Sequence, residues 1–132
     1  MSTLFSRIIH RELDAHIVFE QDEFIAILDR APINPGHILL IPFEEVEEVI
    51  DLSPQRYQAI WLLVQKFSAV LKLAFNAPKV GIVVEGFGVP HAHIHLIPIY
   101  QGNQLNPERA KEASNEELAE AADKIRNALA HR

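Results

Sequence analysis

The chain has 132 residues, of which 48% are hydrophobic and 23% are charged, and this balance predicts a single domain over residues 1–132 with a buried core. The formal net charge of −6 argues against broad nucleic-acid binding, and the absence of cysteine excludes disulfides and thiolate metal sites. No apolar run approaches the roughly 20 residues that a membrane span requires. Because the N-terminus also lacks the features of a signal peptide, we expect a cytoplasmic protein without membrane contact.

The first half of the chain predicts a short helix over residues 4–12, followed by strands. The strands are rich in β-branched or aromatic residues and are bounded by turn residues: residues 17–20, 24–29 and 37–41. A loop with two prolines and one glycine, residues 30–36, separates the last two of these strands. Residues 44–50 predict a short amphipathic helix.

The second half contains the longest predicted helix. Ser53 and Pro54 form an N-cap followed by proline at the first helical position, and apolar residues recur at helical spacing to about Asn76. A strand over 80–85 comes next, and a final helix starts at Ser114 with a capping box and continues toward Ala130. This order predicts an α+β fold, with a largely antiparallel sheet packed against one long helix.

The most informative segment is His91-Ala92-His93-Ile94-His95, in which three histidines alternate with small or apolar residues between Pro90 and Pro98. Along a strand, side chains at positions i, i+2 and i+4 point to one face, so the three imidazoles should share a surface. Imidazole serves as acid, base, nucleophile and metal ligand. The segment therefore predicts an active site.

Two kinds of chemistry fit this row of histidines. A zinc ion with nitrogen ligands at about 2.0–2.1 Å could be shared by His91 and His93. It could not easily hold His95 as well, because His91 and His95 are ~13 Å apart on an extended strand. Alternatively, one imidazole attacks an electrophile while its neighbours orient it and receive charge. The residues alone leave both possibilities open.

Together with a second block, the histidine segment resembles the signature of the histidine triad (HIT) family of nucleotide hydrolases and transferases. The second block follows the order and spacing of that family in four pieces: Val18–Glu20, Phe24–Asp29, Pro35–His37 and Leu40–Pro42. Leu4–Ile9 resembles the opening helix of the family. The resemblance covers about residues 4–100 of one HIT-like domain and leaves 101–132 as a C-terminal extension with a helix. It implies no cofactor and no metal.

The resemblance implies that His93 attacks the α-phosphorus of a nucleotide and forms a nucleotidyl-histidine intermediate, which water then hydrolyses. The backbone carbonyl of His91 would accept the Nδ1–H of His93, and His95 would donate to the phosphate oxygens and the leaving group. His37 matches a fourth histidine beside the first one of the triad. The implied substrate is a purine nucleoside phosphoramidate or a dinucleoside polyphosphate.

Further positions match the nucleotide pocket of the family. Asp29 matches the ribose-binding carboxylate, although a strand-end aspartate can also cap the following loop. Four apolar residues fall where relatives line the purine pocket, although each could be plain core: Phe5, Ile8, Phe19 and Ile27. The interval 85–90 lacks any Asn, Gln, Ser or Thr, so we expect backbone N–H groups at Gly86 or Gly88, or the segment 101–104, to hold phosphate.

Three functions follow from these observations. The first is a nucleotide hydrolase or nucleotidyl transferase acting through His93. The second is a nucleotide-binding module with weak or no turnover, which the shortened interval 85–90 motivates. The third is a metal-dependent enzyme that uses His91, His93 and His37. The HIT family commonly forms twofold homodimers, and the apolar helix from Pro54 and the strand from Val80 fit such an interface.

Overall fold

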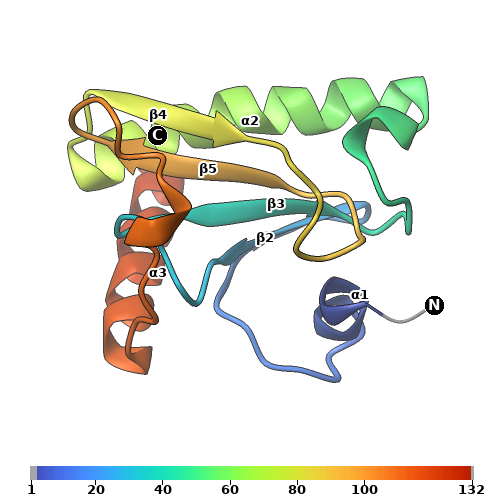
Figure 1. Ribbon diagram of the computed structural model, residues 1–132, viewed down its shortest axis with the longest axis horizontal. Coiled ribbons are helices and arrows are strands. Elements are labelled where there is room, and N and C mark those ends of the chain that lie inside the picture. Colours follow the sequence, from blue (N-terminus) through green and yellow to red (C-terminus); the bar gives the residue numbers. More distant parts are fainter. Residues whose placement is uncertain (1–2, 132) are drawn as a thin grey trace.

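Five strands form one antiparallel sheet in the order β1-β2-β3-β5-β4, and three α-helices lie against it (Figure 1). In this computed structural model, which describes residues 3–131, the strands have the following bounds: β1 Ile17–Glu20, β2 Phe24–Leu28, β3 Ile38–Pro42, β4 Lys79–Val83 and β5 Ile94–Ile99. The helices are α1 Leu4–Ile9, α2 Pro54–Phe75 and α3 Asn115–Ala130. The predicted α+β fold with an antiparallel sheet and one long helix is confirmed.

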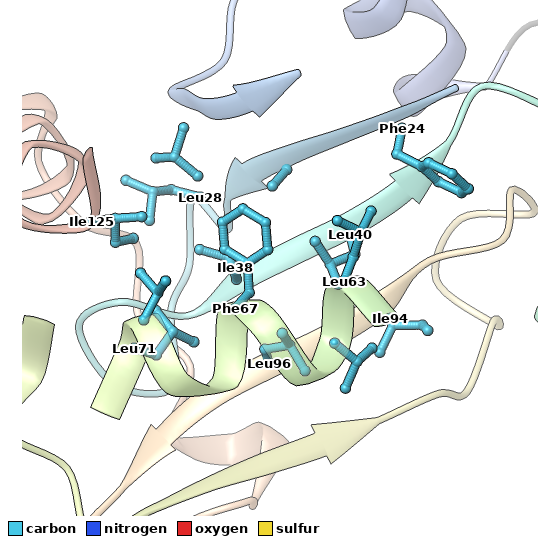
Figure 2. Close-up of a cluster of buried hydrophobic side chains, with 14 of the residues drawn as sticks. Phe24, Leu28, Ile38, Leu40, Leu63, Phe67, Leu71, Ile94, Leu96 and Ile125 are labelled. Atoms are coloured by element: carbon cyan, nitrogen blue, oxygen red, sulfur yellow. The ribbon is translucent and has the colours of Figure 1, made fainter. Parts of the chain in front are cut away.

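The two faces of the sheet bury different sets of residues. On one face, Phe67 of α2 packs with Leu40 of β3, Leu96 of β5 and Ile125 of α3 to form the main core (Figure 2). The opposite face buries a smaller cluster, in which α1 contributes Phe5 and Ile8 and the strands contribute Ile25, Ile27 and Leu39. Side chains alternate between the two faces along a strand. Accordingly, the odd-numbered residues of β2 and β3 belong to the smaller cluster, and even-numbered residues such as Ala26 and Leu40 belong to the main core.

Helix α2 begins and ends where the sequence predicts. Ser53 Oγ accepts the N–H of Arg56, Pro54 occupies the first turn, and Asn76 ends the helix in the left-handed conformation with φ of 50°. By length and composition this helix could cross a membrane, so the expectation that no apolar run reaches that length was wrong. Since Phe67 and Leu71 on α2 are fully buried against the sheet and α3, the helix is the core helix of a folded domain.

The predicted helix over residues 44–50 is not formed; only Val49–Asp51 adopts a single 3₁₀ turn. Glutamates at positions 44, 45, 47 and 48 place like charges three and four residues apart, an arrangement that disfavours an α-helix. The carbonyl of Val46 instead accepts the N–H of Ala92 at 2.7 Å. This contact ties the segment to the start of the histidine row.

Candidate active site

A groove of about 1000 Å³ runs across the face of the sheet opposite α2. One end is lined by Phe5 and Ile8 of α1, and the other end is lined by residues that follow β5, including Leu105. His93 and His95 lie between these two ends. The ring of His93 packs edge-on against Phe5 with a centroid distance of 4.8 Å, and the rings of His93 and His95 are 5.0 Å apart.

The backbone carbonyl of His91 fixes the proton on the ring of His93. His93 Nδ1 lies 2.7 Å from this oxygen, and because a carbonyl only accepts, Nδ1 must carry the hydrogen. The other ring nitrogen, Nε2, therefore keeps its lone pair. Burial lowers the pKa of His93 below its ordinary value, although the hydrogen bond to His91 opposes this effect. His93 is thus a neutral imidazole with a free nucleophilic nitrogen at neutral pH.

The side chain of His91 is buried beneath the groove, and both of its ring nitrogens form hydrogen bonds. Its Nε2 lies 2.8 Å from the carbonyl oxygen of Pro42 and must donate, so its Nδ1 accepts the hydroxyl of Thr3 at 3.2 Å. The ring is buried and does not line the groove. The expectation that the three imidazoles lie on one face of the sheet nevertheless holds, because the ring of His91, like that of His93, packs edge-on against Phe5 of α1, with a centroid distance of 6.1 Å. The alternation of a strand extends back from β5, which begins at Ile94, because Ala92 packs with Ile94 and Leu96 in the main core on the other face.

His37 forms a hydrogen-bonded pair with His95, so the expectation that it lies beside His91, the first histidine of the triad, was wrong. The backbone N–H of Ile33 donates to His37 Nδ1 at 3.1 Å, so the ring proton of neutral His37 sits on Nε2. This nitrogen is 2.9 Å from His95 Nδ1, which accepts and leaves the proton of His95 on its own Nε2. Burial lowers the pKa of His37 to about 4, despite Asp29 nearby, and burial also lowers the pKa of His95. Both rings are neutral donors at pH 7.

Asp29 joins this pair from the end of β2. Its Oδ1 accepts the N–H of Ala31 at 2.9 Å, which is the loop-capping contact expected of a strand-end aspartate. Its Oδ2 lies 3.5 Å from His37 Nε2 and 4.0 Å from His95 Nδ1. The carboxylate therefore caps its loop with one oxygen and presents the other to the groove.

A metal ion fits these residues poorly. Asp29, His37 and His95 place one ligand atom each within 4.8 Å of one another. However, a metal on His37 Nε2 would require the proton on Nδ1, where the N–H of Ile33 already points. The ligand set of the metal-dependent alternative, His91, His93 and His37, fits no better. Both ring nitrogens of His91 and Nδ1 of His93 already form hydrogen bonds within the protein.

Most of the predicted nucleotide-binding residues line the groove, in two groups. The apolar and acidic group comprises Phe5, Ile8, Ile27 and Asp29, and the loop group comprises Gly86 and Gly88. Residues 101–104, the other candidate for holding phosphate, do not line it. Gln104 Oε1 instead accepts the N–H of Tyr100 at 2.7 Å.

The prediction for Phe19 was wrong, because this residue lies on the other face of the sheet. Its ring packs edge-on against Phe67 of α2, with a centroid distance of 5.0 Å. In β1, Ile17 pairs with Ile27 but Phe19 already pairs with Ala26, so the strand contains one extra residue. Such a bulge reverses the facing of every side chain that follows it.

Sequence reasoning missed three contributors to the site. Thr3 and Ile33 act through hydrogen bonds to ring nitrogens, and no local pattern marks a residue for that role. The third contributor is the segment 101–113, which we term the strap; its Leu105, Pro107 and Ala110 line the groove. A polar segment with glycine and proline indicates a loop but not where it lies.

Comparisons with known proteins agree with this geometry. Residues 10–102 match the HIT domain family. An uncharacterised HIT-like protein of Borreliella burgdorferi is 31% identical over 123 residues, which cover 82% of this chain and 88% of that protein. A bis(5′-adenosyl)-triphosphatase of Dictyostelium discoideum is 32% identical over 89 residues, or 64% of this chain and 60% of the relative. The crystal structure of a HIT-like protein from Bartonella henselae superposes with a TM-score of 0.87 at 31% identity and covers 97% of this chain and 96% of that one. The chain therefore belongs to the HIT family.

Proposed function

We propose that this protein is a nucleotide hydrolase or nucleotidyl transferase that attacks the α-phosphate of a purine nucleotide through His93. The observation that carries the proposal is the hydrogen bond of 2.7 Å between His93 Nδ1 and the carbonyl oxygen of His91. It leaves Nε2 unprotonated in a ring that lines the groove. The triphosphatase of Dictyostelium discoideum among its relatives supports a reaction at phosphorus.

The rest of the groove suggests how a nucleotide would lie. The purine would pack against Phe5, Ile8 and Ile27, and the ribose hydroxyls would donate to Asp29 Oδ2. The α-phosphate would then lie at His93, within reach of backbone N–H groups of the loop at Gly86 and Gly88. Preorganised donors of this kind stabilise the charge that grows on phosphate oxygens in the transition state.

The reaction would proceed in two steps. His93 Nε2 forms a bond to the α-phosphorus while the bond to the leaving group breaks, and His95 Nε2–H relays a proton between water and the leaving atom. Water then attacks the same phosphorus, releases the nucleoside monophosphate and restores neutral His93. Positioning and electrostatic stabilisation carry most of the catalysis in such transfers.

A second candidate is a nucleotide-binding module with weak or no turnover. It is favoured by the loop before the histidine row, which offers no side-chain hydroxyl or amide between Glu85 and Pro90. Measurable nucleotide binding without any product would support this candidate over the first.

The experiment that tests the proposal is intact-protein mass spectrometry after a brief acid quench. The protein is incubated with an adenosine phosphoramidate and, separately, with a diadenosine polyphosphate. We expect a transient adduct of one adenylyl group and free monophosphate, both absent in His93→Ala and both kept in His131→Ala, a control at an exposed histidine. Monophosphate release by folded His93→Ala at a similar rate would contradict the proposal.

We also propose that the protein is a cytoplasmic homodimer. β4 is an edge strand of the sheet and carries the exposed Ile82, and Leu62 and Leu73 are exposed on α2. Apolar side chains on an unpaired strand edge suit pairing with a second copy. Light scattering should give the mass of a dimer, and Ile82→Asp should shift it toward a monomer. A monomeric wild type at micromolar concentration would contradict this assembly.

A further inference from the structure

The strap runs antiparallel to the loop that joins β2 to β3, residues 29–37, and bonds to alternate residues of it. The three hydrogen bonds are Arg109 Nη2 to Asn34 Oδ1 at 2.9 Å, the N–H of Lys111 to the carbonyl oxygen of Pro32 at 3.4 Å, and the N–H of Ala113 to the carbonyl oxygen of Arg30 at 2.9 Å. The match to the HIT domain family ends at residue 102, so nearly all of the strap lies beyond it. A segment outside the family match therefore holds the loop that contains Asp29 and precedes β3.

Asn34 is the buried centre of this contact. Its Oδ1 faces Arg109, which can only donate, and its amide nitrogen is 2.8 Å from the carbonyl oxygen of Pro98, which can only accept. These two partners fix the amide in one orientation. The backbone carbonyl of Asn34 also accepts the N–H of His37 at 3.2 Å. Asn34 thus ties the strap, the end of β5 and the turn before His37 to one another.

The same loop carries both groups that determine the tautomer of His37. The N–H of Ile33 points at His37 Nδ1, and Asp29 Oδ2 lies 3.5 Å from His37 Nε2, so both favour a hydrogen on Nε2. This hydrogen is donated to His95 Nδ1 at 2.9 Å, which leaves the hydrogen of the His95 ring on its Nε2.

The opposite tautomer of His37 would remove the donor of His95. His37 Nε2 would then accept, so His95 Nδ1 would have to carry the hydrogen, and His95 Nε2 would have none to offer to a leaving group. The course of the loop therefore decides whether the groove-lining ring of His95 can act as a donor.

We propose that Asn34 and Arg109 are positioning residues, which hold the loop on the course that keeps the hydrogen of His95 on Nε2. This inference rests on the proposed function and deepens it, because it connects the strap to the donor for the leaving group. Neither residue lines the groove, so both act through the backbone of Ile33 and the carboxylate of Asp29. The inference adds no chemical step to the reaction.

The first test needs no substrate. Long-range proton–nitrogen correlation spectra of the imidazoles report which ring nitrogen carries the hydrogen. In Arg109→Met and Asn34→Ala, we expect His37 and His95 to change from one tautomer to a mixture of two. His93 should keep its hydrogen on Nδ1 in the same spectra, since a carbonyl outside this loop fixes it. A general loss of structure would disturb all three rings.

The second test compares kcat/KM for two substrates that differ in their need for a proton donor. The amine of adenosine 5′-phosphoramidate needs a proton to leave, whereas the p-nitrophenolate of adenosine 5′-(p-nitrophenyl phosphate) leaves without one. We expect Arg109→Met to lower kcat/KM about 10-fold for the phosphoramidate and less than about 3-fold for the ester. Arg109→Lys keeps one donor for Asn34 and should lie between Arg109→Met and the wild type.

Lys111→Met is the matched control. It also removes one positive charge from the strap, but the Lys111 side chain is exposed outside the groove and its contact with the loop is made by the backbone. This variant should keep the wild-type tautomers and the wild-type ratio of the two substrates. Because Arg109 is exposed, Arg109→Met tests the inference even if Asn34→Ala does not fold.

Unchanged tautomers in folded Arg109→Met, equal losses with the two substrates, or the same losses in Lys111→Met would each overturn the inference. The proposed function fails separately, if the wild type forms no adenylyl adduct and no monophosphate from either substrate. The spectra would still decide in that case whether the strap controls the tautomers of His37 and His95.

Discussion

His37 Nε2 lies 2.9 Å from His95 Nδ1, a contact between side chains that are 58 residues apart in the sequence. Such a contact allows one proton between the two nitrogens, so it is compatible with two neutral rings but not with two imidazolium ions. The buried position of His37 and the N–H of Ile33 on its other nitrogen both favour the neutral form. The pair therefore links the protonation of the site to the stability of the fold.

The first prediction concerns stability in acid. The pKa of His37 is about 4 in the folded protein and about 6.5 in an unfolded chain, so the unfolded state binds more protons between these values. Stability is therefore lost as the pH falls through this window. From pH 7 to pH 5, we expect His37 alone to lower the free energy of unfolding by about 2 kcal/mol.

Urea unfolding of wild type and His37→Gln at both pH values measures this contribution. The substitution should reduce the difference between pH 7 and pH 5, whatever its effect at pH 7. An equal acid sensitivity in the two proteins would show that His37 is not the buried neutral group inferred from its contacts.

The second prediction is the pH dependence of turnover. His93 must be neutral to attack, and its pKa is lowered by burial. We expect kcat/KM to stay constant as the pH falls through about 6.5, the value of a free imidazole, and to decline only at more acidic pH. Initial rates with a phosphoramidate between pH 4 and pH 8 give the profile. An inflection at or above 6.5 would contradict the neutral, buried nucleophile.

The third prediction concerns Thr3, which has two roles. Its hydroxyl caps α1 by accepting the N–H of Ser6 and also donates to His91 Nδ1. Thr3→Val keeps the shape but removes both contacts, so we expect it to cost about 1 kcal/mol of stability. It should also slow turnover, because His91 holds the carbonyl that orients His93.

Thr3→Ser is the matched control, since it restores the hydroxyl. Thermal unfolding and steady-state rates of both variants provide the comparison. If the serine variant loses as much as the valine variant, the methyl group and not the hydroxyl is what matters at this position.

The fourth prediction concerns the glycine before His37. Gly36 has φ of +92°, and a Cβ at this position would lie 2.5 Å from the ring of Phe75. Gly36→Ala should therefore destabilise the protein by about 1–3 kcal/mol, because both the backbone and the ring must shift. Gly102→Ala is a control on the strap, where an added Cβ meets nothing within 4 Å. Equal stability of the two variants in thermal unfolding would refute this explanation.

The sequence predicted those parts of the fold that local interactions determine. The Ser53–Pro54 start of α2 and the capping box between Ser114 and Glu117 at the start of α3 are both present. His37 also comes together with the row of histidines, as the resemblance to the HIT family implied, although it contacts His95 and not His91. In these cases the signal lies within a few residues of the feature, or in a pattern that two separated blocks share.

The remaining features depend on contacts between distant segments. The bulge before Phe19 becomes visible only in the pairing of β1 with β2, and it changed the face on which that ring lies. The carbonyl of Val46 is taken by the N–H of Ala92, which no local helix propensity anticipates. The strap reaches the groove because Arg109 meets Asn34, a partner 75 residues away. Periodicity in the sequence contains none of this information.

Backbone groups, rather than acidic side chains, determine which nitrogen carries the proton in His37, His91 and His93. A carbonyl or an amide stays in place when its own side chain is exchanged. Ile33 can therefore accept many substitutions without altering the imidazole tautomers, provided that the main chain keeps its course. Sequence drift around the groove can thus reshape substrate preference while the chemistry at phosphorus is preserved.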